Sequence, residues 1–192
     1  MIQKKEKFAS VSHQLLVAMP GLLDPFFSGA VIYIAEHSSK GAMGLIINRL
    51  AEFDLTSLFS RVDISMHPSN SKVYPVFLGG PIQPDRGFVL HEPIGSWNSS
   101  LKISDSLALT SSRDILEATA QGNGPAKFIV SLGYSGWGPG QLDSELINNS
   151  WLTIPIIENE LIFDVPAEDK LAAAFKVLGF DPSNLSGVVG HA

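Results

Sequence analysis

Two pairs of adjacent ionisable residues have the chemistry of a metal site or of an acid–base couple. Glu36-His37 and His91-Glu92 each fall where a β-rich segment ends. If those two strand ends met in the fold, two imidazoles and two carboxylates would be available to hold a divalent metal or to exchange protons with a substrate. Adjacent residues on a strand point to opposite faces, however, so at most one member of each pair can face a common site. Histidines at strand ends also commonly hydrogen-bond a loop, and we therefore predict no metal site.

A glycine-rich segment, Gly133 to Gly140, is close to two known motifs without matching either. Gly133-Tyr134-Ser135-Gly136 begins like a serine nucleophile elbow, but Trp137 stands where that motif needs a glycine. The glycines at 136, 138 and 140 lack the spacing of a dinucleotide-binding loop, whose third glycine would stand at Gln141. We therefore assign no catalytic residue and no cofactor, and interpret the segment as a turn between a strand and a helix.

Polar and aromatic residues beside the glycine-rich segments have the character of a recognition surface. Arginine grips a carboxylate or phosphate through two N–H groups, asparagine and glutamine both donate and accept, and tyrosine and tryptophan present rigid contact area. The candidate ligand- or partner-binding residues are Asn48, Arg49, Gly79, Gly80, Arg86, His91, Tyr134, Trp137 and Gln141. In the alternative interpretation, Trp137 and Trp151 belong to the core, and Arg86 pairs with Asp85 or Asp143.

Hydrophobic periodicity predicts the elements that must position these residues. Strands are expected at 15–19, 30–35, 43–47, 73–78, 87–91, 101–103, 107–110, 127–132, 151–154 and 161–163, with a hairpin between the second and the third. Helices are expected at 54–62 with Asp54 as N-cap, from 112 to near 122, at 141–149, and around 171–178 with Gly179 just beyond the end. This mixture predicts an α/β layered domain in which a mixed sheet is covered on both faces.

Composition narrows the class of protein. A length of 192 residues, 45% hydrophobic content and the lack of a linker-like tract favour a single domain over 1–192, with 1–12 as an N-terminal tail. The apolar run at 15–19 is too short for a secretory segment, and the absence of cysteine suits a reducing compartment, so we expect a cytoplasmic protein that has no membrane contact. A net charge of −6 creates no field that favours nucleic acid, and the composition permits a monomer or a weak homodimer.

Four blocks of sequence form a pattern: 15–20 with 24–27, 36–37 with 41–48, 79–81 with 86–91, and 133–137 with 140–142 ahead of Trp151, and the ending 190–192 completes it. In order and spacing, over essentially the whole chain, these blocks resemble the YqgE/AlgH family of bacterial proteins. The resemblance implies a single-domain, three-layer α/β/α protein, here with a mixed and partly barrel-like sheet. It implies no established enzymatic activity. Family members often carry Cys where this chain has Ala35 and Ala where it has Ser135, so a thiol role is not transferred and Ser135 is a poor candidate for shared chemistry.

These observations favour a non-catalytic, cytosolic binding or regulatory protein whose partner is another protein or a metabolite. The alternative is an enzyme that acts on a small anionic substrate through Glu36, His37, His91 and Glu92 beside the glycine-rich turn. The label of putative transcriptional regulator that the family carries suggests a third role, but the negative charge opposes direct binding to DNA.

Overall fold

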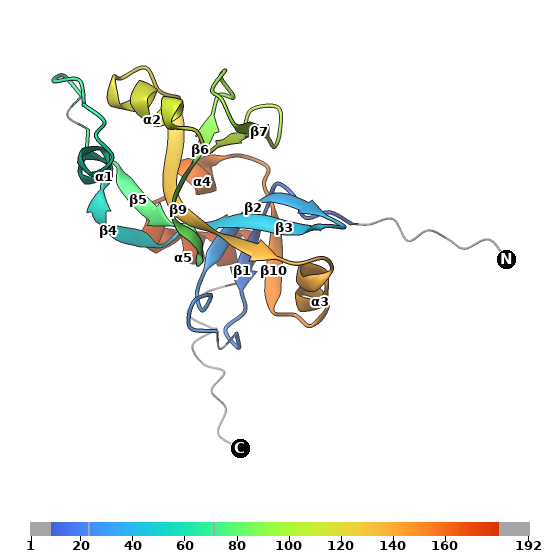
Figure 1. The fold of residues 1–192 in the computed structure, drawn as a ribbon. Helices are drawn as coiled ribbons and strands as arrows, with labels where there is room; N and C mark the ends of the chain where they lie inside the picture. The colour runs from blue at the N-terminus through green and yellow to red at the C-terminus, as the bar shows by residue number, and fades with distance from the viewer. Residues whose placement is uncertain (1–8, 23, 71, 181–192) are drawn as a thin grey trace.

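The computed structural model describes residues 9–22, 24–70 and 72–180. Its strands are β1 (Gln14–Ala18), β2 (Val31–Ser38), β3 (Gly41–Ile46), β4 (Leu50–Asp54), β5 (Pro75–Leu78), β6 (Ile82–Glu92), β7 (Ser100–Lys102), β8 (Ala108–Thr110), β9 (Lys127–Trp137) and β10 (Trp151–Pro155). Its helices are α1 (Leu55–Arg61), α2 (Arg113–Ala120), α3 (Gln141–Ile147), α4 (Glu160–Phe163) and α5 (Lys170–Val177), with a 3-10 turn at Ala167–Asp169 (Figure 1).

All ten strands belong to one curled sheet that is organised around β9. The main path of hydrogen-bonded neighbours runs β10-β1-β2-β3-β9-β6-β8-β7, while β5 joins β9 in parallel and β4 pairs with β5. Every other pairing in the sheet is antiparallel, so the predicted mixed sheet is confirmed. The predicted hairpin between the second and third strands is also present, as β2 and β3.

The short connection between β5 and β6 crosses over β9. Both strands pair with residues 130–132 of β9, so they must lie on its opposite edges. The chain at Gly79 and Gly80 passes so close to β9 that a Cβ on Gly80 would lie 2.0 Å from the carbonyl carbon of Tyr134. A Cβ on Gly133 would lie 2.4 Å from the Gly80 oxygen, and Gly133 has a φ of +69°. Only residues without a side chain permit this crossing.

This crossing corrects the prediction of a turn over 133–140. The strand β9 continues to Trp137, and only 138–140 turn the chain into α3, with Gly140 at a φ of +70°. Glycine is a strong turn signal, but in Gly133 it serves the close approach of a neighbouring backbone within a strand. Sequence alone does not separate these two uses.

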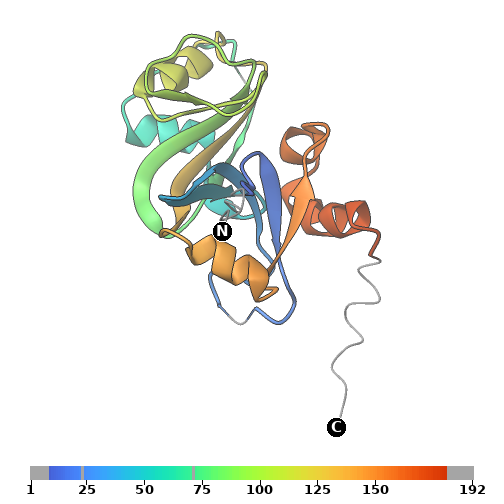
Figure 2. The same ribbon diagram turned by 90° about the vertical axis from the view of Figure 1, so that its right-hand side faces the viewer.

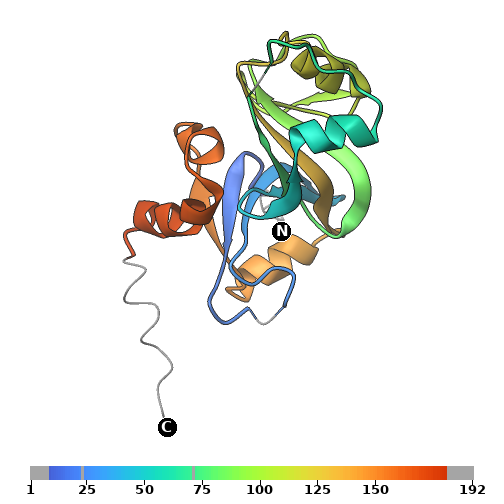
Figure 3. The ribbon, with the colours of Figure 1, turned by 90° about the vertical axis from the view of Figure 1, so that its left-hand side faces the viewer.

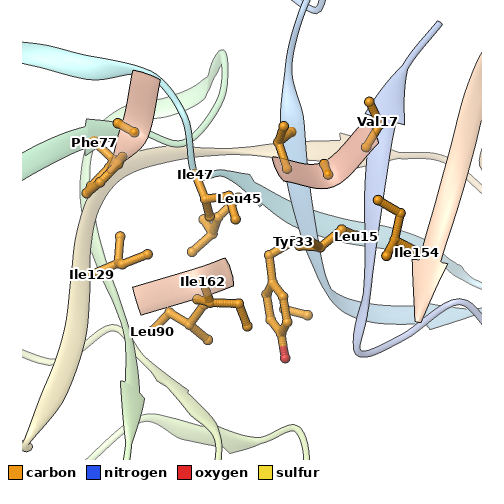
Figure 4. Close-up of a cluster of buried hydrophobic side chains, with 14 of the residues drawn as sticks. Leu15, Val17, Tyr33, Leu45, Ile47, Phe77, Leu90, Ile129, Ile154 and Ile162 are labelled. Atoms are coloured by element: carbon orange, nitrogen blue, oxygen red, sulfur yellow. The ribbon is translucent and has the colours of Figure 1, made fainter. Parts of the chain in front are cut away.

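Side-chain alternation along the strands divides the core into an inner and an outer face of the sheet. The inner face carries one cluster that joins β1, β2, β3, β5, β6, β8, β9 and β10 to α4 and α5. Figure 4 shows part of this cluster around Tyr33, Leu90 and Ile162. The outer face carries two clusters, one under α3 around Trp137 and one under α1 and α2 around Phe59. Figure 2 shows α4 and α5 together on one side, and Figure 3 shows α1 and α2 at one end. The three-layer α/β/α arrangement is therefore confirmed.

Two local details depart from the predicted elements. Residues 50–54 form β4, which was not predicted, and residues 161–163 lie in α4 and not in a strand. The α4 turn is closed by bonds from the N–H groups of Ile162 and Phe163 to the Asn159 oxygen. Its C-terminal carbonyls are satisfied by Lys170, whose buried Nζ donates to the oxygens of Leu161 (2.9 Å) and Ile162 (2.5 Å). This contact comes from the next helix, α5, so the apolar composition of residues 161–163 did not reveal it.

The caps at two helices follow the prediction. The Asp54 carboxylate accepts from the Ser57 N–H at 2.8 Å at the start of α1, and Gly179, with a φ of +77°, follows the end of α5. At the N-terminus, Ser10, Val11 and Ser12 hydrogen-bond His37, so the last residues of the expected tail over 1–12 are tied to β2. Residues 1–8 lie outside the described residues.

Replacement of Gly133 by alanine should destabilise the fold by about 2 kcal/mol or more, because the new Cβ meets both a left-handed φ and the Gly80 oxygen. The matched control is Gly87→Ala in β6, where no atom lies within 4 Å of the added Cβ. Urea denaturation of both variants measures the difference. Equal unfolding midpoints for the two would contradict the crossing as described.

The burial of Lys170 should make the free energy of unfolding increase with pH in the alkaline range. Burial lowers the pKa of Lys170 from 10.5 to about 8, against the opposing influence of the Asp164 carboxylate. Between pH 8 and 10.5 the unfolded chain therefore holds a proton that the folded chain has released, so the free energy of unfolding rises across this window, by up to about 3 kcal/mol. Urea denaturation of the wild type and of Lys170→Met, each over this pH range, measures the contribution of Lys170 to the slope. The comparison removes the contribution of other groups, such as Tyr33, because burial raises the pKa of Tyr33 equally in both proteins. Parallel pH profiles for the two proteins would refute it.

Candidate functional site

A pocket of about 440 Å³ opens on the inner face of the sheet, between the β2–β3 hairpin and the strands β6, β8 and β9. Its apolar lining includes Met43, Phe88, Leu101 and Leu109. Its polar and charged lining comprises Glu36, Ser38, Lys40, Arg86, Ser99, Ser111 and Tyr134. The volume lies in the range of about 300–1,000 Å³ that small-molecule sites occupy, and a few polar groups over an apolar floor are typical of such sites.

Arg86 is the charged group that this pocket holds most firmly. Its guanidinium donates to Gln83 Oε1 at 3.2 Å and to Ser111 Oγ at 3.0 Å, and its carbon lies 5.2 Å from the centre of the Phe88 ring. Phe88 in turn packs edge-on against Tyr134, with ring centres 5.6 Å apart. Two of the five N–H groups are thus engaged by neutral acceptors, and no carboxylate in the described residues forms an ion pair with Arg86. The alternative pairing with Asp85 or Asp143 is therefore not found.

Glu36 reaches the pocket because of an irregularity in β2. The pairing of β2 with β3 shifts between Ile34 and Glu36, so that Ala35 is an extra residue and Glu36 stands opposite Met43. A β-bulge of this kind reverses the alternation of the side chains that follow it. Glu36 consequently lies on the inner face with Met43, while the buried His37 faces α3 on the outer face.

Arg86 also occupies an irregular position. The register of β6 on β9 shifts between Ile82 and Gly87, and Gln83 in this stretch has a φ of +49°. Bulges concentrate near functional sites because they re-aim a side chain out of the regular pleat. A break in strand regularity thus places Glu36 in the pocket, and Arg86 lies beside another such break.

The two glutamate–histidine pairs do not share a site. His37 neighbours Ala42, which pairs with Trp137 at one end of β9, whereas His91 pairs with Phe128 at the other end. The His37 Nδ1 accepts from the Val11 N–H at 3.1 Å, which leaves Nε2 to donate to Asp143 at 3.4 Å. Within residues 9–22, 24–70 and 72–180, no group of three or more His, Asp or Glu side chains could hold a metal ion.

His91 is a buried histidine of β6 that holds the loop after this strand and the end of β8. Its Nδ1 donates to the Pro93 carbonyl at 2.9 Å and its Nε2 accepts from the Thr110 hydroxyl at 2.8 Å. Burial lowers the pKa of His91, and the Trp97 ring packs against it edge-on. It lies apart from the pocket.

Other predicted residues are engaged within the protein. Asn48 accepts from the Val31 N–H and donates to the Gly29 oxygen, and Arg49 donates to the oxygens of Phe26 and Ser28, so both brace the loop before β2. Gly79 and Gly80 form the crossing over β9. Of the nine predicted residues, the structure brings Arg86, Tyr134 and Trp137 to the pocket.

Trp137 and Gln141 belong to a hydrogen-bonded cluster on Glu145. The indole N–H groups of Trp137 and Trp151 both donate to Glu145 Oε2, at 2.9 and 2.7 Å, and Gln141 donates to Oε1 at 2.9 Å. Both tryptophans are buried, so the core interpretation of these side chains is correct, although Trp137 also borders the pocket.

Sequence reasoning missed Lys40, Ser111 and Phe88 as pocket residues and considered Glu36 only for a metal or acid–base site with His37, His91 and Glu92. A strand register shift leaves no residue-type signal of its own, so the face that Glu36 occupies was not available from the sequence. The usable signal in the sequence was the spacing of Arg86 and Phe88. Residues i and i+2 of a regular strand lie on the same face of the sheet.

Comparisons with known proteins place the chain among bacterial relatives over nearly its whole length. A model of the family described as AlgH-like matches residues 15–183. A UPF0301 protein of Bordetella petrii is 54% identical over 181 residues, which cover 94% of this chain and 89% of that protein. A UPF0301 protein of Cupriavidus pinatubonensis is 48% identical over 189 residues, covering 98% and 99%.

Two solved structures resemble the fold. The solution structure of AlgH from Pseudomonas aeruginosa superposes with a TM-score of 0.78 at 42% identity, covering 98% of this chain and 100% of that one. A crystal structure of the protein DIP2367 from Corynebacterium diphtheriae gives a TM-score of 0.68 at 17% identity, with 89% and 88% coverage, and supports the fold alone.

Glu145 should be essential for the stability of the outer core. Glu145→Ala leaves two buried indole N–H groups without an acceptor and should lower the free energy of unfolding by about 2–4 kcal/mol. Glu145→Gln keeps one carbonyl oxygen for both indoles and should cost less than half as much. Urea titration followed by tryptophan fluorescence compares them, and an alanine variant as stable as the glutamine variant would contradict the cluster's role.

Proposed function

This chain belongs to the AlgH-like family, and we propose that it binds a small molecule with a carboxylate or phosphate group in the pocket around Arg86 without transforming it. The observation that carries the proposal is the state of Arg86. Neutral acceptors and an aromatic ring hold its guanidinium in place. The other N–H groups of the guanidinium are uncommitted within the described residues, and Arg86 lines the pocket. A pre-positioned arginine without an internal counter-ion is suited to a carboxylate or phosphate, because the ligand supplies the missing charge.

The other arginines give a useful contrast. Arg113 has the Glu117 carboxylate at 2.7 Å, and Arg49 is committed to two backbone oxygens. Arg61 also lies over an aromatic ring, at 4.3 Å from the centre of Phe53, but it sits on α1 on the outer face. Only Arg86 among these four combines a fixed orientation with a place in a pocket of ligand size.

A binding role without catalysis is favoured by the internal hydrogen bonds of the candidate catalytic groups. Both ring nitrogens of His37 and of His91 have partners inside the protein, and the two histidines lie at opposite ends of β9. The buried Ser135 hydroxyl donates to the Gly79 oxygen at 3.1 Å, which commits it to the β5–β6 connection. The enzymatic alternative needed Glu36, His37, His91 and Glu92 to meet a substrate together.

The wider setting of the protein forms part of the same proposal. No helix in the described ranges is long and apolar enough to cross a membrane. The net charge of −6 disfavours direct contact with nucleic acid, so any regulatory role would run through a small molecule or a protein partner. The cytoplasmic location expected from the absence of cysteine stays a prediction.

The test is a ligand-observed NMR screen of small carboxylates and phosphate esters, followed by calorimetric titration of the hits. Arg86→Gln should weaken binding of a hit by about ten-fold or more, because charge-assisted hydrogen bonds contribute about 1.5–3 kcal/mol. Arg61→Gln, which also removes an arginine from an aromatic ring, should bind as the wild type does. The hit should be recovered chemically unchanged.

Two results would reject this function. One is a set of anions none of which binds saturably. The other is an Arg86→Gln protein that stays folded by circular dichroism and binds the hit with wild-type affinity.

A further inference from the structure

The pocket carries uncompensated charges of both signs. Glu36, Lys40 and Arg86 line it, and none of the three forms an ion pair within the part of the chain that the structure describes. A site for a simple anion gains nothing from a carboxylate in its wall, because that carboxylate repels the ligand. The structure nevertheless turns Glu36 into the pocket, through the bulge in β2.

We infer that the ligand is a zwitterion, an α-amino acid with an apolar side chain, whose carboxylate lies at Arg86 and whose ammonium group lies at Glu36. This inference rests on the proposed binding function and specifies the ligand class for the same pocket. Each charge of the ligand then meets the opposite charge on the protein, and neither protein group needs an internal counter-ion.

The floor of the pocket supplies the rest of the ligand's contacts. Met43, Phe88 and Leu109 belong to the inner core or pack on it, and Leu101, with 40% of its surface exposed, borders the opening. These groups form an apolar surface beside the charged ones. An aliphatic or aromatic side chain of an amino acid would cover that apolar surface and remove it from water. A short polar anion would leave the same surface exposed to water.

Lys40 determines how selective the site can be. It lies on the exposed turn between β2 and β3 and gives the pocket one more positive than negative charge. The carboxylate end of the ligand is therefore favoured over the ammonium end. A carboxylic acid that lacks the amino group should still bind, though more weakly, and an amine that lacks the carboxylate should bind least.

The test compares three ligand series on one protein: leucine and phenylalanine, their deaminated acids 4-methylpentanoate and 3-phenylpropanoate, and the amines 3-methylbutylamine and 2-phenylethylamine. Affinities at pH 7 are measured by saturation-transfer NMR and calorimetry for the wild type, Glu36→Gln and Arg86→Gln. Glu52→Gln is the matched control, because Glu52 is also an exposed strand carboxylate but lies in β4, away from this pocket.

In the wild type and in Glu52→Gln, the amino acids should bind at least ten-fold more tightly than the deaminated acids. In Glu36→Gln this ratio should fall toward one, while the affinity for the deaminated acids should be unchanged or higher. Arg86→Gln should lose both kinds of ligand.

The outcomes separate the two proposals. If deaminated acids bind through Arg86 but amino acids bind no better, or if Glu36→Gln keeps the wild-type ratio, the zwitterion inference is overturned and anion binding survives. If neither the amino acids nor the deaminated acids bind, and the anion screen also fails, both proposals are overturned.

Discussion

The passage of one backbone over another at Gly79, Gly80 and Gly133 is the constraint on which the architecture depends. Because β5 and β6 flank β9 on opposite edges and only a few residues join them, the connection has to cross β9 in contact with it. A Cβ on Gly79 would lie 2.2 Å from the Ser131 hydroxyl, and the Gly80 contact is closer still. The crossing lets β9 pair with β5, β6 and β3, so a single strand joins the region under α1 and α2 to the region under α3.

The candidate site follows from this arrangement of the sheet. Tyr134 comes from β9 immediately after the crossing, and Arg86 comes from the stretch of β6 that rejoins the regular pairing at Gly87. The hairpin of β2 and β3 closes the other side, with its bulge aiming Glu36 inward and His37 outward. The pocket therefore depends on irregular strand positions in an otherwise regular sheet, because the bulge in β2 places Glu36 on the inner face and Arg86 lies at the end of the irregular stretch of β6.

Sequence reasoning predicted most of the strands and helices because these depend on local patterns. The periodicity of Leu55, Leu58 and Phe59 with an Asp54 cap, and the alternation along Val31 to Ala35, are complete within a few residues. The failures have a common origin in contacts between separate elements, which the pattern within one element does not show. Gly133 is a strand residue because Gly80 lies against it, 161–163 are helical because Lys170 caps them, and Glu36 enters the pocket because β3 pairs with a shifted register. The rim of polar residues was predicted from residue type alone. Residue type did not distinguish Asn48 and Arg49, which brace a loop, from Arg86, which lines the pocket.

The position of β10 at the end of the sheet has a consequence for how the chain is made. β1 is synthesised long before β10, yet one of its two edges pairs with β10, in a register that joins Leu15 to Ile154. A nascent chain can form the β2–β3 hairpin early, but β1 then presents an open edge until β10 has left the ribosome. Pairing between strands so far apart in the chain slows folding and leaves the edge of β1 open to other chains until β10 arrives.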